Sequence, residues 1–314
     1  MPDRSLQNRA LVMLAFVMVF WAGNSIIGRA VRFDIPPFTL AFFRWSGALL
    51  IVAPFAVTAV RRDMAAIRKG WLPIVVLGLL GVAAFNALLY KGLHYTPATN
   101  GLLLQAAIPA MVVLFDRLIF GTRAGGLQTA ATLISTVGVL AIVLQGDPAA
   151  ATRLRFGTGD VLILAAVTAW ALYTVLLRLR PPTAPISFIF VTFLIGTLAM
   201  APLTLWEAWS GPWVNWTPLA FAAIGYVALL PSLAAYFMFN FATATLGPAR
   251  AGQAITLMPL FGAVLSVLIL GERLEGYHLA GMAFIVGGIA ISMLGLRGKE
   301  SAGAQANGRI EGRK

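Results

Sequence analysis

Long apolar stretches alternate with short polar connections along most of the chain. A helix needs about 20 mainly apolar residues to cross a bilayer. Ten stretches fit this requirement, near residues 10–29, 38–58, 72–93, 97–119, 126–144, 159–179, 186–206, 217–241, 247–270 and 277–296. Because the connections are short, they leave no room for a separate soluble domain. The pattern predicts an all-α membrane protein with ten transmembrane helices.

The composition supports a membrane protein and argues against a soluble one. Of the 314 residues, 60% are hydrophobic and 11% are charged, whereas soluble domains are about 25% charged. The net charge of +12 does not predict nucleic-acid binding, because the basic residues are spread over separate connections. The chain has no cysteine, and we find no metal-ligand cluster, P-loop or nucleophile elbow. The sequence therefore predicts no cofactor and no enzymatic activity.

The basic residues also predict an orientation. If the N-terminus is cytoplasmic, the inner connections hold 13 lysine and arginine residues and the outer connections hold 6. Lysine and arginine are enriched in cytoplasmic loops, so both termini are expected in the cytoplasm. Residues 298–314 are expected to form a disordered tail. It contains Ile310-Glu311-Gly312-Arg313, a protease-cleavage sequence of the kind that is added for protein expression.

The two halves of the chain match each other at nearly constant spacing. Tryptophan, proline and glycine positions in the first five stretches recur in the same order in the last five, 145 to 151 residues later. The pairs include Trp21 and Trp170, Pro37 and Pro185, Trp71 and Trp216, Pro97 and Pro248, Pro109 and Pro259, and Gly138 and Gly288. We therefore predict two five-helix repeats, residues 1–148 and 149–297.

An odd number of helices per repeat has a consequence for topology. The second repeat must cross the membrane in the opposite direction to the first. Inverted repeats of this kind are typical of secondary transporters, whose substrate site lies near the midplane between the repeats. Two similar halves also have two near-equivalent packings, as alternating access requires. The predicted architecture is ten helices around a central cavity.

The fourth and ninth stretches each have a proline near the middle, Pro109 and Pro259. A proline inside a helix frees a carbonyl group and bends the helix, so we expect a hinge at each. Nearby polar side chains are Asn100, Gln105, Gln253 and Thr256. Polar groups inside a membrane need partners. They could bond to neighbouring helices or line the cavity, and we favour the cavity because Gln105 and Thr256 occupy equivalent positions beside equivalent prolines.

Two tryptophans lie well inside their stretches, away from the membrane interface where tryptophan is usual. Trp21 is followed by Asn24, and its counterpart Trp170 is followed by Tyr173. The rings could fill the core or form two walls of the cavity, and we favour the walls. The lining could be extended by Asn86 and Tyr90 in the third stretch and by Tyr236 and Asn240 in the eighth.

One charged residue lies deep in a stretch. Arg44 is about 10 Å into the second helix, and a charge costs about 2.5–3.5 kcal/mol near a helix centre. It could attract a substrate carboxylate, or it could reach outward or bond free carbonyl groups. Acidic residues, in contrast, lie at the ends of stretches or in connections. Exporters of cationic drugs usually need a buried carboxylate, so we expect a neutral or zwitterionic substrate.

Several motifs resemble the drug/metabolite transporter superfamily. They are Phe20-Trp21-Ala22-Gly23-Asn24, Ile35-Pro36-Pro37 with Arg44, and the run from Pro248-Ala249-Arg250 through Pro259 to Leu270-Gly271-Glu272-Arg273-Leu274. The resemblance extends to about residue 297 and implies two EamA-type repeats. The first half departs from it, with Gly121-Thr122-Arg123 in place of Gly-Glu-Arg. The chain is most similar to bacterial inner-membrane exporters of the YddG kind, which implies export of aromatic and other neutral amino acids.

The sequence thus predicts a secondary transporter that exports amino acids across the bacterial inner membrane by alternating access. Its expected partners are a small-molecule substrate and the lipid bilayer. The alternative with the same fold is an exporter of drugs or other small metabolites. A membrane-embedded binding protein and an intramembrane enzyme are further alternatives, and the lack of a buried acid or base counts against the enzyme. The oligomeric state stays open, and the sequence is compatible with a monomer.

Overall fold

The computed structural model describes residues 4–105, 107–121, 126–144, 146–147, 157–211, 213–246, 254–288 and 290–291. All regular elements in these ranges are helical. The first half contains α1 (Arg4–Ala30), α2 (Pro37–Lys69), α3 (Trp71–Leu77), the π-helical segment η1 (Gly78–Ala84), α4 (Phe85–Tyr95), α5 (Ala98–Gln105), α6 (Ile108–Phe120) and α7 (Gly126–Val143). The second half contains α8 (Thr158–Leu176), η3 (Leu177–Leu179), α9 (Pro185–Ser210), α10 (Pro218–Ala228), the π-helical η4 (Leu229–Ala234), α11 (Ala235–Leu246), η5 (Ile255–Leu257), α13 (Met258–Leu265), the π-helical η6 (Ser266–Leu270) and a helix over residues 276–288.

Among the described residues, seven helical segments are long and apolar enough to cross a membrane. They are Ser5–Ala30, Pro37–Lys69, Trp71–Tyr95, Ala98–Phe120, Thr158–Leu179, Pro185–Ser210 and Pro218–Phe239. The fifth and ninth expected crossings contain shorter apolar helices, Thr129–Gly138 and Leu260–Leu270. The all-helical membrane fold is confirmed, whereas ten crossings in two inverted repeats stay a prediction. The expected tail, residues 298–314, lies outside the described residues.

Prolines and glycines set several helix boundaries. Pro37, Pro185 and Pro218 open α2, α9 and α10, where the missing N–H costs nothing and the fixed φ suits the first turn. Gly121 ends α6 and Gly271 ends η6, with φ of 68° and 64°. Only glycine adopts this left-handed conformation readily. These glycines open Gly121-Thr122-Arg123 and Gly271-Glu272-Arg273, the two segments that the family resemblance singled out.

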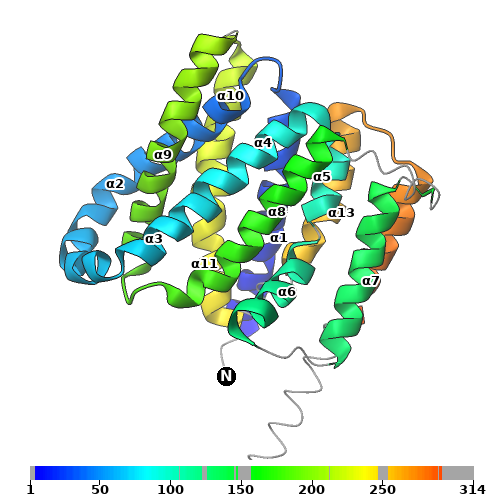
Figure 1. Ribbon diagram of the computed structural model, residues 1–314, viewed down its shortest axis with the longest axis horizontal. Helices are drawn as coiled ribbons and strands as arrows, with labels where there is room; N and C mark the ends of the chain where they lie inside the picture. Colours follow the sequence, from blue (N-terminus) through cyan, green and yellow to red (C-terminus); the bar gives the residue numbers. More distant parts are fainter. Residues whose placement is uncertain are drawn as a thin grey trace, which may run out of the picture.

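The helices form a bundle in which elements of the two halves pack against each other (Figure 1). The most extensive contacts pair α2 with α9, α4 with α8, and α1 with α11. In Figure 1, α2 and α9 run side by side at one edge of the bundle, and α7 lies at the opposite edge. The rings of Trp45 on α2 and Phe193 on α9 are buried with their centroids 4.5 Å apart. The core is thus built largely between the halves.

Glycines allow two pairs of helices to approach closely. A Cβ atom on Gly196 of α9 would lie 2.1 Å from Cγ1 of Val82 in η1. A Cβ atom on Gly138 of α7 would lie 2.7 Å from the carbonyl oxygen of Gly281. Small residues permit such backbone approach in membrane helices. Large apolar side chains such as Leu50, Phe55 and Leu268 are more than two-thirds exposed on the outside of the bundle, as a lipid-facing surface requires.

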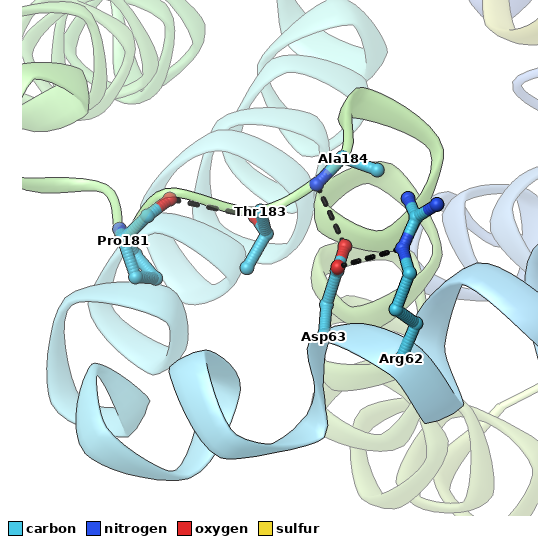
Figure 2. Close-up of polar contacts among 5 residues, drawn as sticks. All are labelled: Arg62, Asp63, Pro181, Thr183 and Ala184. Carbon is cyan, nitrogen blue, oxygen red and sulfur yellow. Dashed lines mark hydrogen bonds and ion pairs between the residues drawn. The ribbon is translucent and has the colours of Figure 1, made fainter.

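Carboxylates link α2 and α9 at both ends of the pair. Figure 2 shows one end, where the backbone N–H of Ala184, just before α9, donates to Oδ2 of Asp63 on α2 over 2.7 Å. Arg62 approaches the other oxygen of Asp63 at 3.5 Å. At the far end of the pair, Glu207 of α9 binds the first turn of α2. Each carboxylate accepts N–H groups that a helix start leaves without partners.

Candidate functional site

A buried network of hydrogen bonds surrounds Arg44 between α1, α2, α4 and η4. Nη1 of Arg44 donates to Oδ1 of Asn24 over 2.7 Å, to Oδ1 of Asn86 over 3.0 Å and to the Tyr90 hydroxyl over 3.0 Å. Nε donates to Oγ of Ser232 over 2.8 Å. Only 5% of Arg44 is exposed. We call these five residues the arginine cage.

The cage is assembled by four elements from both halves. Asn24 comes from α1, Arg44 from α2, and Asn86 and Tyr90 from α4, whereas Ser232 comes from η4 in the second half. The neutral partners are themselves fixed: the Tyr90 hydroxyl donates to Asn24 over 2.6 Å, and Asn86 Nδ2 donates to the Val82 carbonyl over 2.9 Å. The guanidinium is thus held in one orientation.

The hydrogen bonds of the arginine cage exclude two of the orientations that the sequence left open for the Arg44 side chain. The side chain neither reaches outward nor binds backbone carbonyls, since its acceptors are all side-chain oxygens. These acceptors are neutral. The ion pairs found among the described residues, Arg62 with Asp63 and Arg178 with Asp116, lie elsewhere. The buried charge therefore has hydrogen bonds but no counter-ion within the described part of the chain.

A cavity adjoins the cage. Seven of the residues that the sequence predicts as substrate-binding line it: Trp21, Asn24, Arg44, Asn86, Gln105, Trp170 and Tyr236. The lining also contains Trp45, Phe85, Ile108, Ile255 and Met258. Elements of both halves contribute. A few polar groups in a mainly apolar wall are typical of small-molecule sites.

Aromatic rings form two sides of this cavity. Nε1 of Trp21 donates to the Pro231 carbonyl over 3.0 Å, and the Trp21 ring lies 6.4 Å from that of Tyr236 in an edge-on contact. Trp170 packs against Phe85 and Tyr173, at centroid distances of 4.8 and 5.1 Å. The expected pair of tryptophan walls therefore lies around one cavity. Tyr173 does not line the cavity. Its ring packs between Trp170 and η1.

Gln105 stands where the fourth expected crossing breaks. Helix α5 ends at Gln105 and α6 begins at Ile108, with Pro109 in the first turn of α6. Nε2 of Gln105 donates to Ser25 Oγ and to the Gly101 carbonyl, both over 3.2 Å, while its Oε1 accepts no hydrogen bond from a described residue. Pro259 likewise falls in the first turn of α13, directly after the short helix η5. Each proline therefore lies just after a local irregularity in its crossing, where a proline ring disturbs the carbonyl four residues earlier. That these positions act as hinges stays a prediction.

Other predicted site residues lie away from the cavity or outside the description. Tyr90 belongs to the cage but does not line the cavity. Asn100 Oδ1 lies 2.7 Å from Nε2 of His278, a contact between α5 and the helix over 276–288. Gln253 and the side chains of Asn240, Thr256, Pro109 and Pro259 lie outside the described residues.

Two important residues escaped the sequence analysis. Ser232 supplies the contact of the cage to the second half, and the Pro231 carbonyl holds Trp21. Both lie in η4, a proline followed by a polar residue inside an apolar stretch. A proline inside an apolar stretch, with polar side chains nearby, also drew attention to Pro109 and Pro259, so this signal could have identified η4 too. Trp45, adjacent to Arg44, lies with its ring centroid 4.6 Å from the guanidinium carbon.

Several proteins with similar sequences are named as transporters or exporters. An uncharacterized transporter of Archaeoglobus fulgidus is 28% identical over 91% of this chain and 98% of its own length. The uncharacterized transporter YyaM of Bacillus subtilis is 23% identical, covering 90% and 92%. A probable terminal-alkyne amino-acid exporter of Streptantibioticus cattleyicolor is 25% identical, also covering 90% of this chain and 93% of its own.

A solved structure and a family model also match this chain over most of its length. A crystal structure described only as that of a protein superposes with a TM-score of 0.63 and 19% identity, covering 93% of this chain and 98% of the other. At this identity the likeness shows the fold alone. The model of the EamA-like transporter family matches twice, at residues 8–144 and 157–294. The chain therefore belongs to the EamA-like transporter family, within the drug/metabolite transporter superfamily.

Proposed function

We propose that this protein exports amino acids, aromatic and other neutral ones, across the bacterial inner membrane by alternating access. The observation that carries the proposal is the cavity beside the arginine cage, with indole rings and amide groups in its wall. Amides and a guanidinium can bind the polar end of an amino acid, and the rings can bind an apolar side chain. The orientation with both termini in the cytoplasm belongs to this proposal.

The two-repeat organisation supports the transport mechanism. The family model matches each half separately, and the matched ranges fall within the proposed repeats 1–148 and 149–297. The cavity takes Asn24, Arg44 and Asn86 from the first half and Trp170 and Tyr236 from the second. A site shared between inverted repeats can open to one side of the membrane and then to the other as the halves rock.

Export of cationic drugs is the competing function. A cation needs a negative partner in a membrane cavity. The described lining holds a buried arginine and no carboxylate, so it repels a cation. The relative named as an amino-acid exporter favours amino acids over drugs.

Purified protein in proteoliposomes tests the proposal. The vesicles are loaded in turn with labelled phenylalanine, tryptophan, leucine, alanine and threonine, and efflux is measured with and without a proton gradient. We expect efflux of the aromatic amino acids that depends on the protein. No efflux for any of them would contradict amino-acid transport. Inhibition by lipophilic cations at low concentration, without inhibition by unlabelled amino acids, would favour drug export instead.

A further inference from the structure

Arg44 keeps two N–H groups that no described residue uses. A guanidinium has five N–H donors. The Nε donor binds Ser232, and the Nη1 donors are shared among Asn24, Asn86 and Tyr90. No described residue accepts a hydrogen bond from Nη2. Since Arg44 also lines the cavity, Nη2 is the part of the guanidinium left for a ligand.

The positive charge of Arg44 has no counter-ion among the described residues, so an anionic ligand can pair with it. The other four residues of the arginine cage are neutral, and the described cavity lining contains no carboxylate. A buried cation without an anion is unfavourable, because the low dielectric weakens its solvation. An anionic group that enters the cavity removes this penalty. The site therefore favours a ligand with a negative group at the end that faces Arg44.

We propose that Nη2 of Arg44 anchors a carboxylate of the substrate, and that this carboxylate, more than the ammonium group, decides which molecules bind. The inference rests on the amino-acid transport proposed above. A carboxylate forms charge-assisted hydrogen bonds with a guanidinium, which are stronger than bonds between neutral groups.

The described lining offers no negative group to the ammonium group of an amino acid. Gln105 Oε1 can accept one hydrogen bond, and the ring faces of Trp21 and Trp170 can attract a cation weakly. Neither provides a full negative charge. Carboxylates that lack the amino group are therefore also substrates, whereas amines and amides that lack the carboxylate are not.

The cage also explains why arginine and not lysine serves here. Four hydrogen bonds fix the guanidinium plane from α1, α4 and η4. With the plane fixed, the direction of Nη2 is fixed too, and less freedom is lost when a carboxylate binds. A lysine ammonium is a point charge on a flexible stem and cannot make the same set of contacts.

Four molecules with one phenyl side chain separate the two ends of the substrate. Phenylalanine, phenylalaninamide, phenethylamine and 3-phenylpropanoate each compete against labelled phenylalanine in wild-type proteoliposomes. We expect 3-phenylpropanoate to compete within about threefold of phenylalanine, and the amide and the amine to compete about tenfold more weakly, because an ionic hydrogen bond has about that effect. This series needs no variant, so it does not depend on the folding of a mutant.

Two variants then assign the effect to Arg44. Arg44→Gln removes the charge, and we expect it to abolish the preference for phenylalanine over its amide. Arg29→Gln is the matched control, since it removes an arginine that donates to the Leu93 and His94 carbonyls and does not line the cavity; we expect the preference to remain. Arg44→Lys should retain part of the preference and lose affinity.

The outcomes are distinguishable. Phenylalanine transport with equal competition by phenylalaninamide overturns the carboxylate anchor and leaves the proposed function standing. Competition by phenethylamine without competition by 3-phenylpropanoate overturns the anchor in favour of ammonium recognition. A carboxylate preference that survives Arg44→Gln in folded protein also overturns it. Absence of phenylalanine flux in the wild type contradicts aromatic amino-acid transport itself.

Discussion

Glu207 of α9 binds Thr39 of α2 twice, through the backbone N–H over 2.8 Å and through the hydroxyl over 2.9 Å. The N–H of Phe38 donates to the other carboxylate oxygen over 3.1 Å. Glu272 makes the same three contacts with another helix start, accepting from the N–H groups of Ala98 and Thr99 and from the Thr99 hydroxyl. In both places a carboxylate of the second half caps a Pro-X-Thr helix start of the first half.

The Glu207 contact predicts a loss of stability on substitution. In Glu207→Gln the side-chain NH₂ faces N–H donors of α2, so at least one capping bond is lost. We expect a decrease of about 1–2 kcal/mol in the free energy of unfolding, measured by thermal unfolding in detergent. Glu275→Gln serves as the control because its side chain is exposed. An equal decrease in both variants would contradict the cap.

The second cap predicts energetic coupling between Glu272 and Thr99. The Thr99 hydroxyl lies 2.6 Å from both Glu272 and Ser266, so removal of either partner disrupts one shared network. We expect Glu272→Gln and Thr99→Val together to cost less than the sum of the single changes, with a coupling of about 0.5–3 kcal/mol. A double-mutant cycle by thermal unfolding measures it, and additive effects would exclude the network.

Close packing of α9 on η1 predicts intolerance at Gly196. A methyl group there would overlap Val82, and overpacking costs about 1–3 kcal/mol. We expect Gly196→Ala to lower the unfolding midpoint, and Val82→Gly in the same chain to restore part of it. Gly225→Ala is the matched control on α10, since no atom lies within 4 Å of its added Cβ. Equal midpoints for Gly196→Ala and Gly225→Ala would disprove the contact.

Hydrophobic periodicity and composition predict the helices well, because both depend on local sequence alone. The seven segments that can span a membrane start within a few residues of the predicted stretches. The π-helical segments were not predicted. A π-helix differs from an α-helix only in which carbonyl each N–H reaches, and no residue type marks η1 in advance. In η4, Pro231 indicates an irregular helix but does not specify a π-helix.

The site was predictable in its residue types and less so in its contacts. Polar and aromatic residues at matching positions of the two halves identified Trp21, Asn24, Gln105 and Trp170 without any structure. One of the contacts of Arg44 is with Ser232, which lies 188 residues away. Such a pairing follows from the packing of η4 against α2, and local sequence does not encode that packing.

Gln105 and Asn100 give the clearest test of the cavity, because both are amides that the sequence predicts as substrate-binding. Gln105 lines the cavity, whereas Asn100 binds His278 away from it. We expect Gln105→Leu to lower phenylalanine flux by about tenfold, since a buried polar contact to the substrate is lost. Asn100→Leu should leave the flux per folded molecule nearly unchanged. If Asn100→Leu abolishes transport and Gln105→Leu does not, the substrate passes along the N-terminal part of α5 and not through the cavity beside Arg44.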